Sequence, residues 1–245
     1  MVQNIFNGIK AYASALGLIS ALSLWKYFAV PVVISFITAV LIGLSAWSWS
    51  DSVANTIGLL WVWEWGADLF HSFTEIIGGI LIIVLGLIVY KHIVMALSAP
   101  FMSPVSTVIE RHFLGEKHIH RNTSNTSQLW RGIRVNVRNL TMEIFITIPL
   151  LVLSLVPTLN IITAVLIFLV QAYYAGFGNM DYTLERHYGY KESVGFVKKH
   201  KGVAIGNGTI FTVMLFIPVI GVLMVLPLSV TAATSQTIRF IKEKK

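Results

Sequence analysis

Residues 27–49 form a run of 23 residues without a single charged side chain, bounded by Lys26 and Asp51. At about 1.5 Å per residue, a helix of this length reaches across a hydrocarbon core of roughly 30 Å. Trp47 and Trp49 lie at its far end, where indole rings favour the membrane interface. The run therefore predicts a transmembrane helix.

The composition of the whole chain agrees with a membrane protein. Of 245 residues, 56% are hydrophobic and 12% are charged, whereas about a quarter of the residues in soluble domains are charged. We therefore expect an all-α integral membrane protein with a single domain over residues 1–245. The sequence has no cysteine, which excludes disulfides, thiolate metal sites and cysteine catalysis.

A second apolar run extends over residues 76–90 and continues past Lys91 and His92 to Ala99. Lys91 can snorkel towards an interface, so we expect a second transmembrane helix over about 76–99. Pro100 disfavours helix at the residue before it and should end or kink this helix.

Two later apolar regions, at about 144–177 and 205–238, are each interrupted by proline. Pro157 and Pro218 lie 61 residues apart and are followed by residues typical of turns. Each region therefore resembles a helical hairpin with a proline at its tip, which makes the pair a weak internal repeat.

The first arms of the two hairpins are short. Residues 144–156 number 13 and residues 209–217 number nine, which is less than a membrane crossing requires. We therefore expect hairpins that enter the bilayer and turn back, with neighbouring helices covering the turns. Four full spans are the alternative, if the arms include flanking residues.

Charge placement predicts the orientation. Residues 51–75 contain four acidic and no basic side chains, so this tryptophan-rich loop should face outward. The positive-inside rule places both termini and the basic loops in the cytoplasm. The positions of the basic residues suit anionic membrane lipids, not nucleic acid. They include Arg111, Lys117, Arg121, Arg131, Arg134, Arg138, Lys191, Lys198, Lys199, Arg239, Lys242, Lys244 and Lys245.

Residues 128–144 show apolar positions at helical spacing with three arginines alongside. The favoured interpretation is an interfacial helix whose arginines bind lipid phosphate. The alternative is an anion pathway lined by Arg131, Arg134 and Arg138.

Two acidic residues in the apolar regions are further pathway candidates. Glu143 requires a partner or a cavity, and Arg138 or Lys91 can supply the partner. Asp181 is expected to cap the helix that follows it, with a role in an ion pathway as the alternative.

No catalytic constellation is visible in the sequence. The histidines of the segment from Glu110 to His120 do not have the spacing of a metal site, so we expect a solvated cytoplasmic segment. The glycines of residues 202–208 lack the ending of a nucleotide-binding loop. We therefore expect no enzyme activity, no cofactor and no metal.

Several short motifs in order resemble the CysZ sulfate permease family, which includes etoposide-induced-protein-type membrane proteins. The resemblance covers nearly the whole chain. The motifs are Ser98-Ala99-Pro100-Phe101, Val108-Ile109-Glu110, Leu114-Gly115, Pro149 with Pro157, Met180-Asp181-Tyr182, Ile217-Pro218-Val219-Ile220-Gly221 and Ala232-Ala233-Thr234.

This resemblance implies two long transmembrane helices, two partly penetrating hairpins and a homo-oligomer that takes up sulfate across the bacterial inner membrane. It also implies an anion site at a Gly-Leu-Arg turn with a second arginine, before the first span. The corresponding residues here are Ser23, Leu24, Trp25 and Lys26. Lys26 can attract an anion as a point charge but lacks the bidentate fork of arginine.

The leading hypothesis is therefore an inner-membrane permease or channel for sulfate or a related small anion. A non-transporting membrane scaffold or lipid-organising protein is the main alternative. A membrane enzyme that acts on lipid is a third.

Overall fold

The computed structural model describes residues 2–58, 82, 85–115, 124–154, 156, 158–217 and 220–242. Within these residues the regular structure is entirely helical, which confirms the predicted all-α class. A helical segment at Leu85–Leu97 adds to the labelled elements. Those elements are α1 (Val2–Ala21), η1 (Leu24–Tyr27), α2 (Ala29–Gly58), α4 (Ala99–Leu114), α5 (Asn125–Leu153), α6 (Asn160–Leu184), α7 (Tyr190–Lys199), α8 (Lys201–Leu215) and α9 (Ile220–Lys242).

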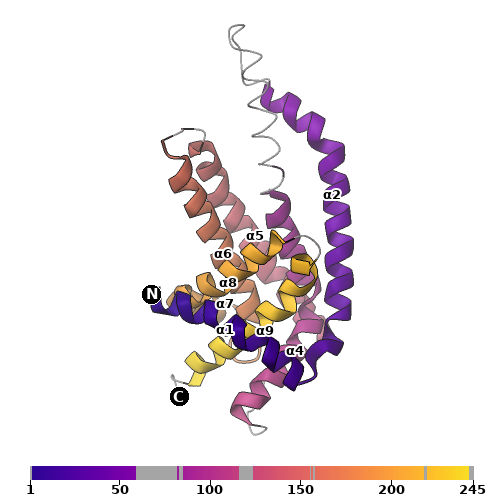
Figure 1. Ribbon diagram of the computed structural model, residues 1–245, viewed down its shortest axis with the longest axis vertical. Helices are drawn as coiled ribbons and strands as arrows, with labels where there is room; N and C mark the ends of the chain where they lie inside the picture. Colours follow the sequence, from indigo (N-terminus) through magenta and orange to yellow (C-terminus); the bar gives the residue numbers. More distant parts are fainter. Residues whose placement is uncertain are drawn as a thin grey trace.

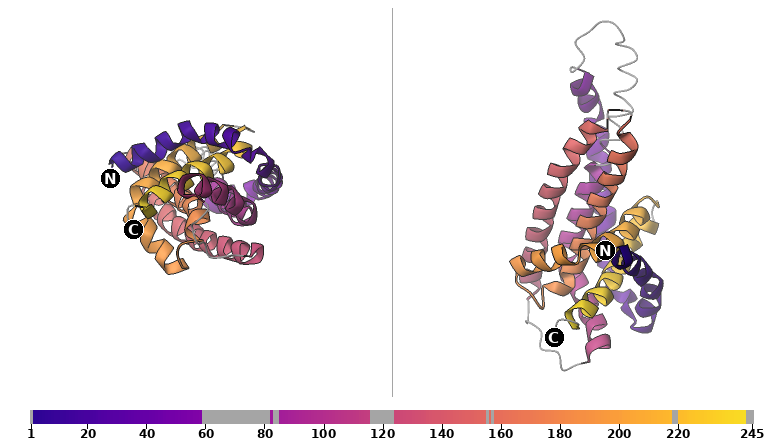
Figure 2. Two further views of the ribbon diagram at one scale, coloured as in Figure 1. Left: turned by 90° about the horizontal axis from the view of Figure 1, so that it is seen from below. Right: turned by 90° about the vertical axis from the view of Figure 1, so that its left-hand side faces the viewer.

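The helices fall into an upright group and a crosswise group (Figures 1 and 2). Helices α2, α5 and α6 run along the long axis, while α1 and α8 run across it near the lower end. In the described part of the chain, three stretches are long and apolar enough to cross a membrane: Leu24–Trp49, α5 and α6. These helices are therefore compatible with a multi-pass membrane protein.

The second predicted span is bent. Leu85–Leu97 and α4 meet at an angle of 68° and together make a fourth candidate crossing. The bend falls at Ser98, and Pro100 occupies the first turn of α4, where a missing N–H is tolerated. The predicted kink at this proline is confirmed, while residues 76–81 of the expected span lie outside the described residues.

The first arm of the first hairpin is longer than its apolar sequence indicates. Helix α5 begins at Asn125 and continues through the expected interfacial helix to Leu153 without a break. Its 29 residues extend about 43 Å, more than the hydrocarbon thickness. The helix therefore includes flanking residues beyond the 13 apolar ones, as the alternative allowed, because a helix continues through polar residues when its buried face finds partners.

The second hairpin is short and crosses the first. Helix α8 has 15 residues, about 22 Å, and its backbone contacts that of α6. A Cβ on Gly208 would lie 1.7 Å from the carbonyl oxygen of Ala172, and one on Gly176 would lie 1.9 Å from that of Ala204. The glycines near residue 205 therefore allow close helix packing of the kind found in membrane proteins.

Helix α1 packs over α8 and α9. Gly8, Ala11, Ala15 and Ile19 form its buried face, and a Cβ on Gly8 would lie 2.9 Å from the backbone nitrogen of Asn207. Tyr12 hydroxyl lies 2.8 Å from Asn207 O and 2.6 Å from Ser229 Oγ. Burial raises the pKa of Tyr12, so this phenol stays neutral and ties three helices together.

Candidate functional site

Helix α5 buries a stripe of polar side chains. Asn136, Asn139, Glu143 and Thr147 recur at intervals of three or four residues, and all four are buried. This spacing places them on one face of the helix. Polar groups inside membrane-spanning helices usually face a partner or a pathway, so this face is the candidate site.

Glu143 is paired with Lys91, one of the two partners expected for it. Lys91 Nζ lies 2.5 Å from Glu143 Oε1 and 3.2 Å from the carbonyl oxygen of Gln171. Lys91 is 1% exposed and Glu143 is 0% exposed. Lys91 therefore does not snorkel to an interface as expected, because a buried carboxylate holds its ammonium group inside the bundle.

His92 completes a buried triad with Lys91 and Glu143. Its Nδ1 lies 3.0 Å from Asn136 Oδ1 and its Nε2 lies 3.0 Å from Glu143 Oε2. Asn136 uses its Nδ2 to donate to the carbonyl oxygen of Gly132, so Oδ1 is the atom that accepts from His92.

Both nitrogens of the His92 ring thus face oxygen acceptors. Lys91 donates to the other oxygen of the Glu143 carboxylate, so all three side chains are held together inside the bundle.

Beside this triad, two buried polar atoms have no hydrogen-bond partner among the described residues: Asn139 Nδ2 and Thr147 Oγ1. Arg138 Nη1 donates to Asn139 Oδ1 at 2.9 Å, which leaves the Nδ2 of Asn139 as a free donor. An unpaired buried donor is costly, so this position suits a polar solute.

Arg131 and Asp181, both predicted pathway residues, bind each other. Arg131 Nε and Nη2 donate to the two oxygens of Asp181 at 3.0 and 2.8 Å. Arg131 also donates to Tyr188 O and Ser193 Oγ, so its donors are used by the protein. The expected helix cap at Asp181 was wrong, because α6 continues through this residue to Leu184.

Arg134 and Arg138 line a hollow of about 560 Å³ on the outer side of α5. Arg134 lies over the ring of Tyr190 at 4.2 Å, and Arg138 lies 5.4 Å from the ring of Phe177. Neither arginine has a carboxylate within ion-pairing distance among the described residues. Trp130, Ile133 and Val137 complete the lining.

A second charged cluster lies between α4 and the end of α6. Arg186 Nη2 donates to Glu110 Oε2 at 2.8 Å, and His187 Nε2 lies 2.5 Å from Glu110 Oε1. Glu110 is buried, so the expected solvated segment is wrong at this residue; its later part, residues 116–120, lies outside the described residues. Glu185 accepts a hydrogen bond from Ser103.

The sequence matches the family described as Sulfate transporter CysZ/Etoposide-induced protein 2.4 over residues 11–225. The chain belongs to this family. No curated protein matches the chain significantly. The match agrees with the membrane fold and identifies a family of membrane transporters.

In this CysZ/Etoposide-induced family member, the four residues of the expected anion site form the turn before the first span. Ser23 has φ 53° and ψ 41°, a left-handed conformation that favours glycine. Leu24 is buried and Trp25 is 47% exposed. Lys26 is the cationic side chain of this turn, and its Nζ lies over the ring of the next residue, Tyr27, at 5.2 Å from the ring centroid.

The turn and the polar stripe lie on different parts of the bundle. The turn packs against α1, α2 and α4, whereas α5 packs against α6 and α4. The structure therefore does not gather the predicted residues into one site. Glu143 belongs to the buried stripe and Arg138 borders it through its bond to Asn139. Ser23, Leu24, Trp25 and Lys26 lie apart from both.

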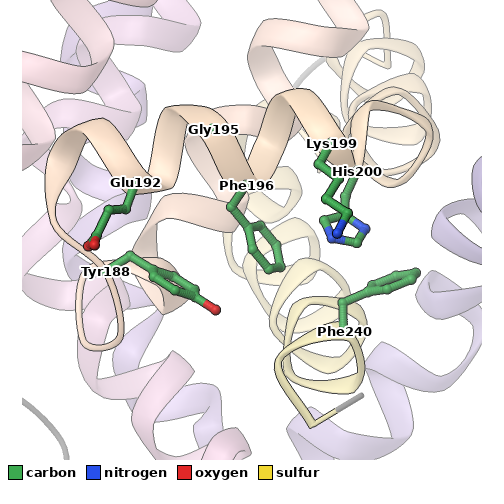
Figure 3. A pocket seen from close by; sticks show the side chains of 7 residues that line it. All are labelled: Tyr188, Glu192, Gly195, Phe196, Lys199, His200 and Phe240. Atoms are coloured by element: carbon green, nitrogen blue, oxygen red, sulfur yellow. The ribbon is translucent and has the colours of Figure 1, made fainter. Parts of the chain in front are cut away.

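A second hollow of about 480 Å³ opens between α7 and α9 (Figure 3). Its aromatic rings pack on one another: Tyr188 on Phe196 at 5.4 Å, Phe196 on His200 at 4.5 Å and His200 on Phe240 at 4.5 Å between centroids. These contacts join α7 and α8 to the C-terminal helix.

Sequence reasoning missed His92, Asn136, Asn139 and Thr147. The three α5 residues recur with Glu143 at helical spacing, and this period is a usable signal. The signal is divided between two predicted elements, because residues 128–144 predict an interfacial helix and residues 144–177 predict a hairpin. His92 carries no such signal, because only the packing of two distant helices brings it to Glu143.

Proposed function

We propose that this protein conducts a small inorganic oxyanion of the sulfate class across the bacterial inner membrane, along the buried face of α5. The observation that carries the proposal is the buried Nδ2 donor of Asn139, which has no partner among the described residues and lies on the same face of α5 as Glu143, next to Arg138. A permeating anion requires hydrogen-bond donors in place of its hydration shell, and a nearby cationic side chain such as Arg138 lowers the cost of its desolvation. Membership of a transporter family supports the same conclusion.

The proposed path follows α5. Arg138 is half-buried and bonded to Asn139, so an anion drawn to its guanidinium reaches the Asn139 donor next. One helical turn further, the Lys91 ammonium uses two of its three donors on Glu143 and Gln171 and offers the third. Thr147 supplies a hydroxyl one turn beyond Glu143. No covalent chemistry is required.

The other predicted residues have different roles in this proposal. Arg131 and Asp181 hold α5 against α6 as a bidentate pair and do not contact the anion. Lys26 is exposed at the turn and attracts anions as a point charge. The positive-inside rule makes the end that carries α1, α7 and the C-terminal part of α9 the cytoplasmic side.

Uptake of radiolabelled sulfate into liposomes containing purified protein tests the proposal. We expect Asn139→Leu and Lys91→Met to abolish most of the uptake, since each removes a donor from the path. Lys198→Gln, which removes an exposed charge from α7, should retain wild-type uptake.

The absence of flux for sulfate, sulfite, phosphate and chloride in wild-type protein would refute transport and favour a non-transporting scaffold. Wild-type flux in both Asn139→Leu and Lys91→Met would instead refute the path along α5. Circular dichroism and gel filtration of each variant separate loss of donors from loss of fold.

The depth of the first hairpin and the oligomeric state belong to the same proposal. A cysteine at Leu159, in the turn between α5 and α6, reports the depth because the chain has no other cysteine. Labelling by an impermeant reagent from outside would show that the hairpin crosses completely. Light scattering of the purified protein would measure whether it is the expected homo-oligomer.

A further inference from the structure

The lipid-facing side of α5 shows where the hydrocarbon layer ends. Between Arg138 and Leu153 its only charged side chain is Glu143, which is buried. Apart from Thr141 and Pro149, the exposed side chains there are large and apolar, and Phe145 is 76% exposed. This stretch of 15 residues extends about 22 Å, so Arg138 and Arg134 lie at the level where lipid headgroups begin.

The hollow at this level combines cationic and amphipathic side chains in a regular pattern. Trp130, Arg134 and Arg138 recur every four residues and form one stripe along α5. Trp130 is 70% exposed, and an exposed indole at the end of a membrane-spanning helix is typical of the headgroup region. Ile133 and Val137 give the same hollow an apolar floor.

The arginines have unused hydrogen-bond donors. Arg134 is exposed and contacts the ring face of Tyr190, a contact that leaves the N–H edge of the guanidinium open. Arg138 uses one nitrogen on Asn139. Two guanidinium groups one helical turn apart can donate together to a phosphate group.

We infer that this hollow is a binding site for the phosphate group of an anionic phospholipid. The phosphate accepts from Arg134 and Arg138, the glycerol backbone lies near Trp130 and Tyr190, and the first part of an acyl chain covers Ile133 and Val137. The apolar floor and the lipid-facing position favour a lipid over a free phosphate or sulfate ion, because a small hydrated anion gains nothing from Ile133 and Val137.

The site differs from the proposed path, which follows the buried face of the same helix. The two meet at Arg138, whose guanidinium lines the hollow and also bonds Asn139. A bound lipid would therefore hold Arg138 in the orientation that presents Asn139 to the interior. Lipid binding can be measured without any transport, so the two proposals fail separately.

Native mass spectrometry of the detergent-solubilised full chain, titrated with phosphatidylglycerol and with phosphatidylcholine, tests the inference. Each arginine at a membrane surface contributes about 1 kcal/mol towards an anionic lipid. We therefore expect Arg134→Gln/Arg138→Gln to weaken binding of phosphatidylglycerol about 30-fold. Phosphatidylcholine carries the same phosphate beside a cationic choline, which cancels its net charge, so its binding should weaken much less. The control Lys198→Gln/Lys201→Gln removes the same charge from exposed sites outside the hollow and should bind like wild type.

Equal weakening in the control pair would show a general charge effect and overturn the inference. The proposed path already draws sulfate weakly to Arg138, so the concentration of the competitor decides the outcome. If inorganic phosphate or sulfate, but not chloride at equal ionic strength, displaced phosphatidylglycerol at concentrations as low as those of a competing anionic phospholipid, the hollow would be assigned to the free anion and the inference overturned. If Arg134→Gln/Arg138→Gln does not fold, Arg134→Lys/Arg138→Lys is measured instead. This variant keeps both charges and removes the bidentate donors of the guanidinium groups. We expect that pair to bind phosphatidylglycerol more weakly than wild type, and wild-type affinity would contradict the inference.

Discussion

Lys91 Nζ lies 2.5 Å from Glu143 Oε1, although 52 residues separate the two side chains in the sequence. The pair joins the helical segment Leu85–Leu97 to the middle of α5. Both side chains are buried, and His92 shares the carboxylate. The pair therefore fixes how these two helical segments face each other.

Removal of either member of this pair should destabilise the fold. Glu143→Gln leaves the Lys91 ammonium without its counter-charge, and Lys91→Met leaves the Glu143 carboxylate without its ammonium, each at a cost of about 3–5 kcal/mol. The double variant should cost clearly less than the sum, which unfolding in mixed micelles would measure. Additive costs would show that the two groups do not interact.

The contact between α6 and α8 should not tolerate a methyl group at Gly208. The Cβ would lie 1.7 Å from the carbonyl oxygen of Ala172, so the helices must move apart. We expect Gly208→Ala to lower the thermal midpoint strongly or to prevent folding. Gly43→Ala is the control, because nothing lies within 4 Å of its added Cβ. Equal midpoints for the two variants would contradict the close approach.

The left-handed residue Ser23 should prefer glycine. A left-handed conformation costs a non-glycine residue about 1 kcal/mol, and φ at Ser23 is 53°. Ser23→Gly should therefore raise the free energy of unfolding by up to about 1 kcal/mol, whereas the β-branched Ser23→Val should lower it. Chemical denaturation of the three proteins measures the order, and the reverse order would refute strain at this turn.

The acidic group of Glu185, directly after α6, should make stability depend on pH. Burial raises its pKa to about 7, helped by the Asp181 carboxylate and opposed by the hydrogen bond from Ser103 and by Arg186 and Arg131. A raised pKa means that the folded state holds the proton more tightly. The stabilising effect is thus complete below about pH 4.5 and is lost as the pH rises through about 7.

The variant Glu185→Gln removes this titration. Its free energy of unfolding should change less than that of wild type between about pH 5 and 8, and denaturation across this range gives the comparison. Parallel profiles for the two proteins would show that Glu185 does not carry the effect.

Much of the fold could be predicted from local sequence. The uncharged run before Asp51 and the proline at position 100 predicted a span and a kink, and the structure has both. The length of α5 could not be predicted from hydrophobicity. The first half of α5 carries polar and charged side chains, yet one of its faces is buried against other helices. Which face of a helix is buried depends on the helices that contact it.

The candidate site shows the same division. Glu143 in an apolar region required a partner, and Lys91 was one of the two expected. The ion pair of Arg131 could not be predicted, because Arg131, Arg134 and Arg138 recur at the same helical spacing in the sequence. Only the approach of α6 brings Asp181 to Arg131, whereas the other two arginines have no carboxylate partner within the described part of the chain.

The sequence by itself determined that the chain is an all-α membrane protein of the CysZ/Etoposide-induced family, because uncharged runs and short motifs are local properties. Tertiary structure decided which charges are neutralised and which remain available. Charge pairing acts over a few ångströms in a medium of low dielectric constant, and residues far apart in the sequence reach that distance only when the helices pack.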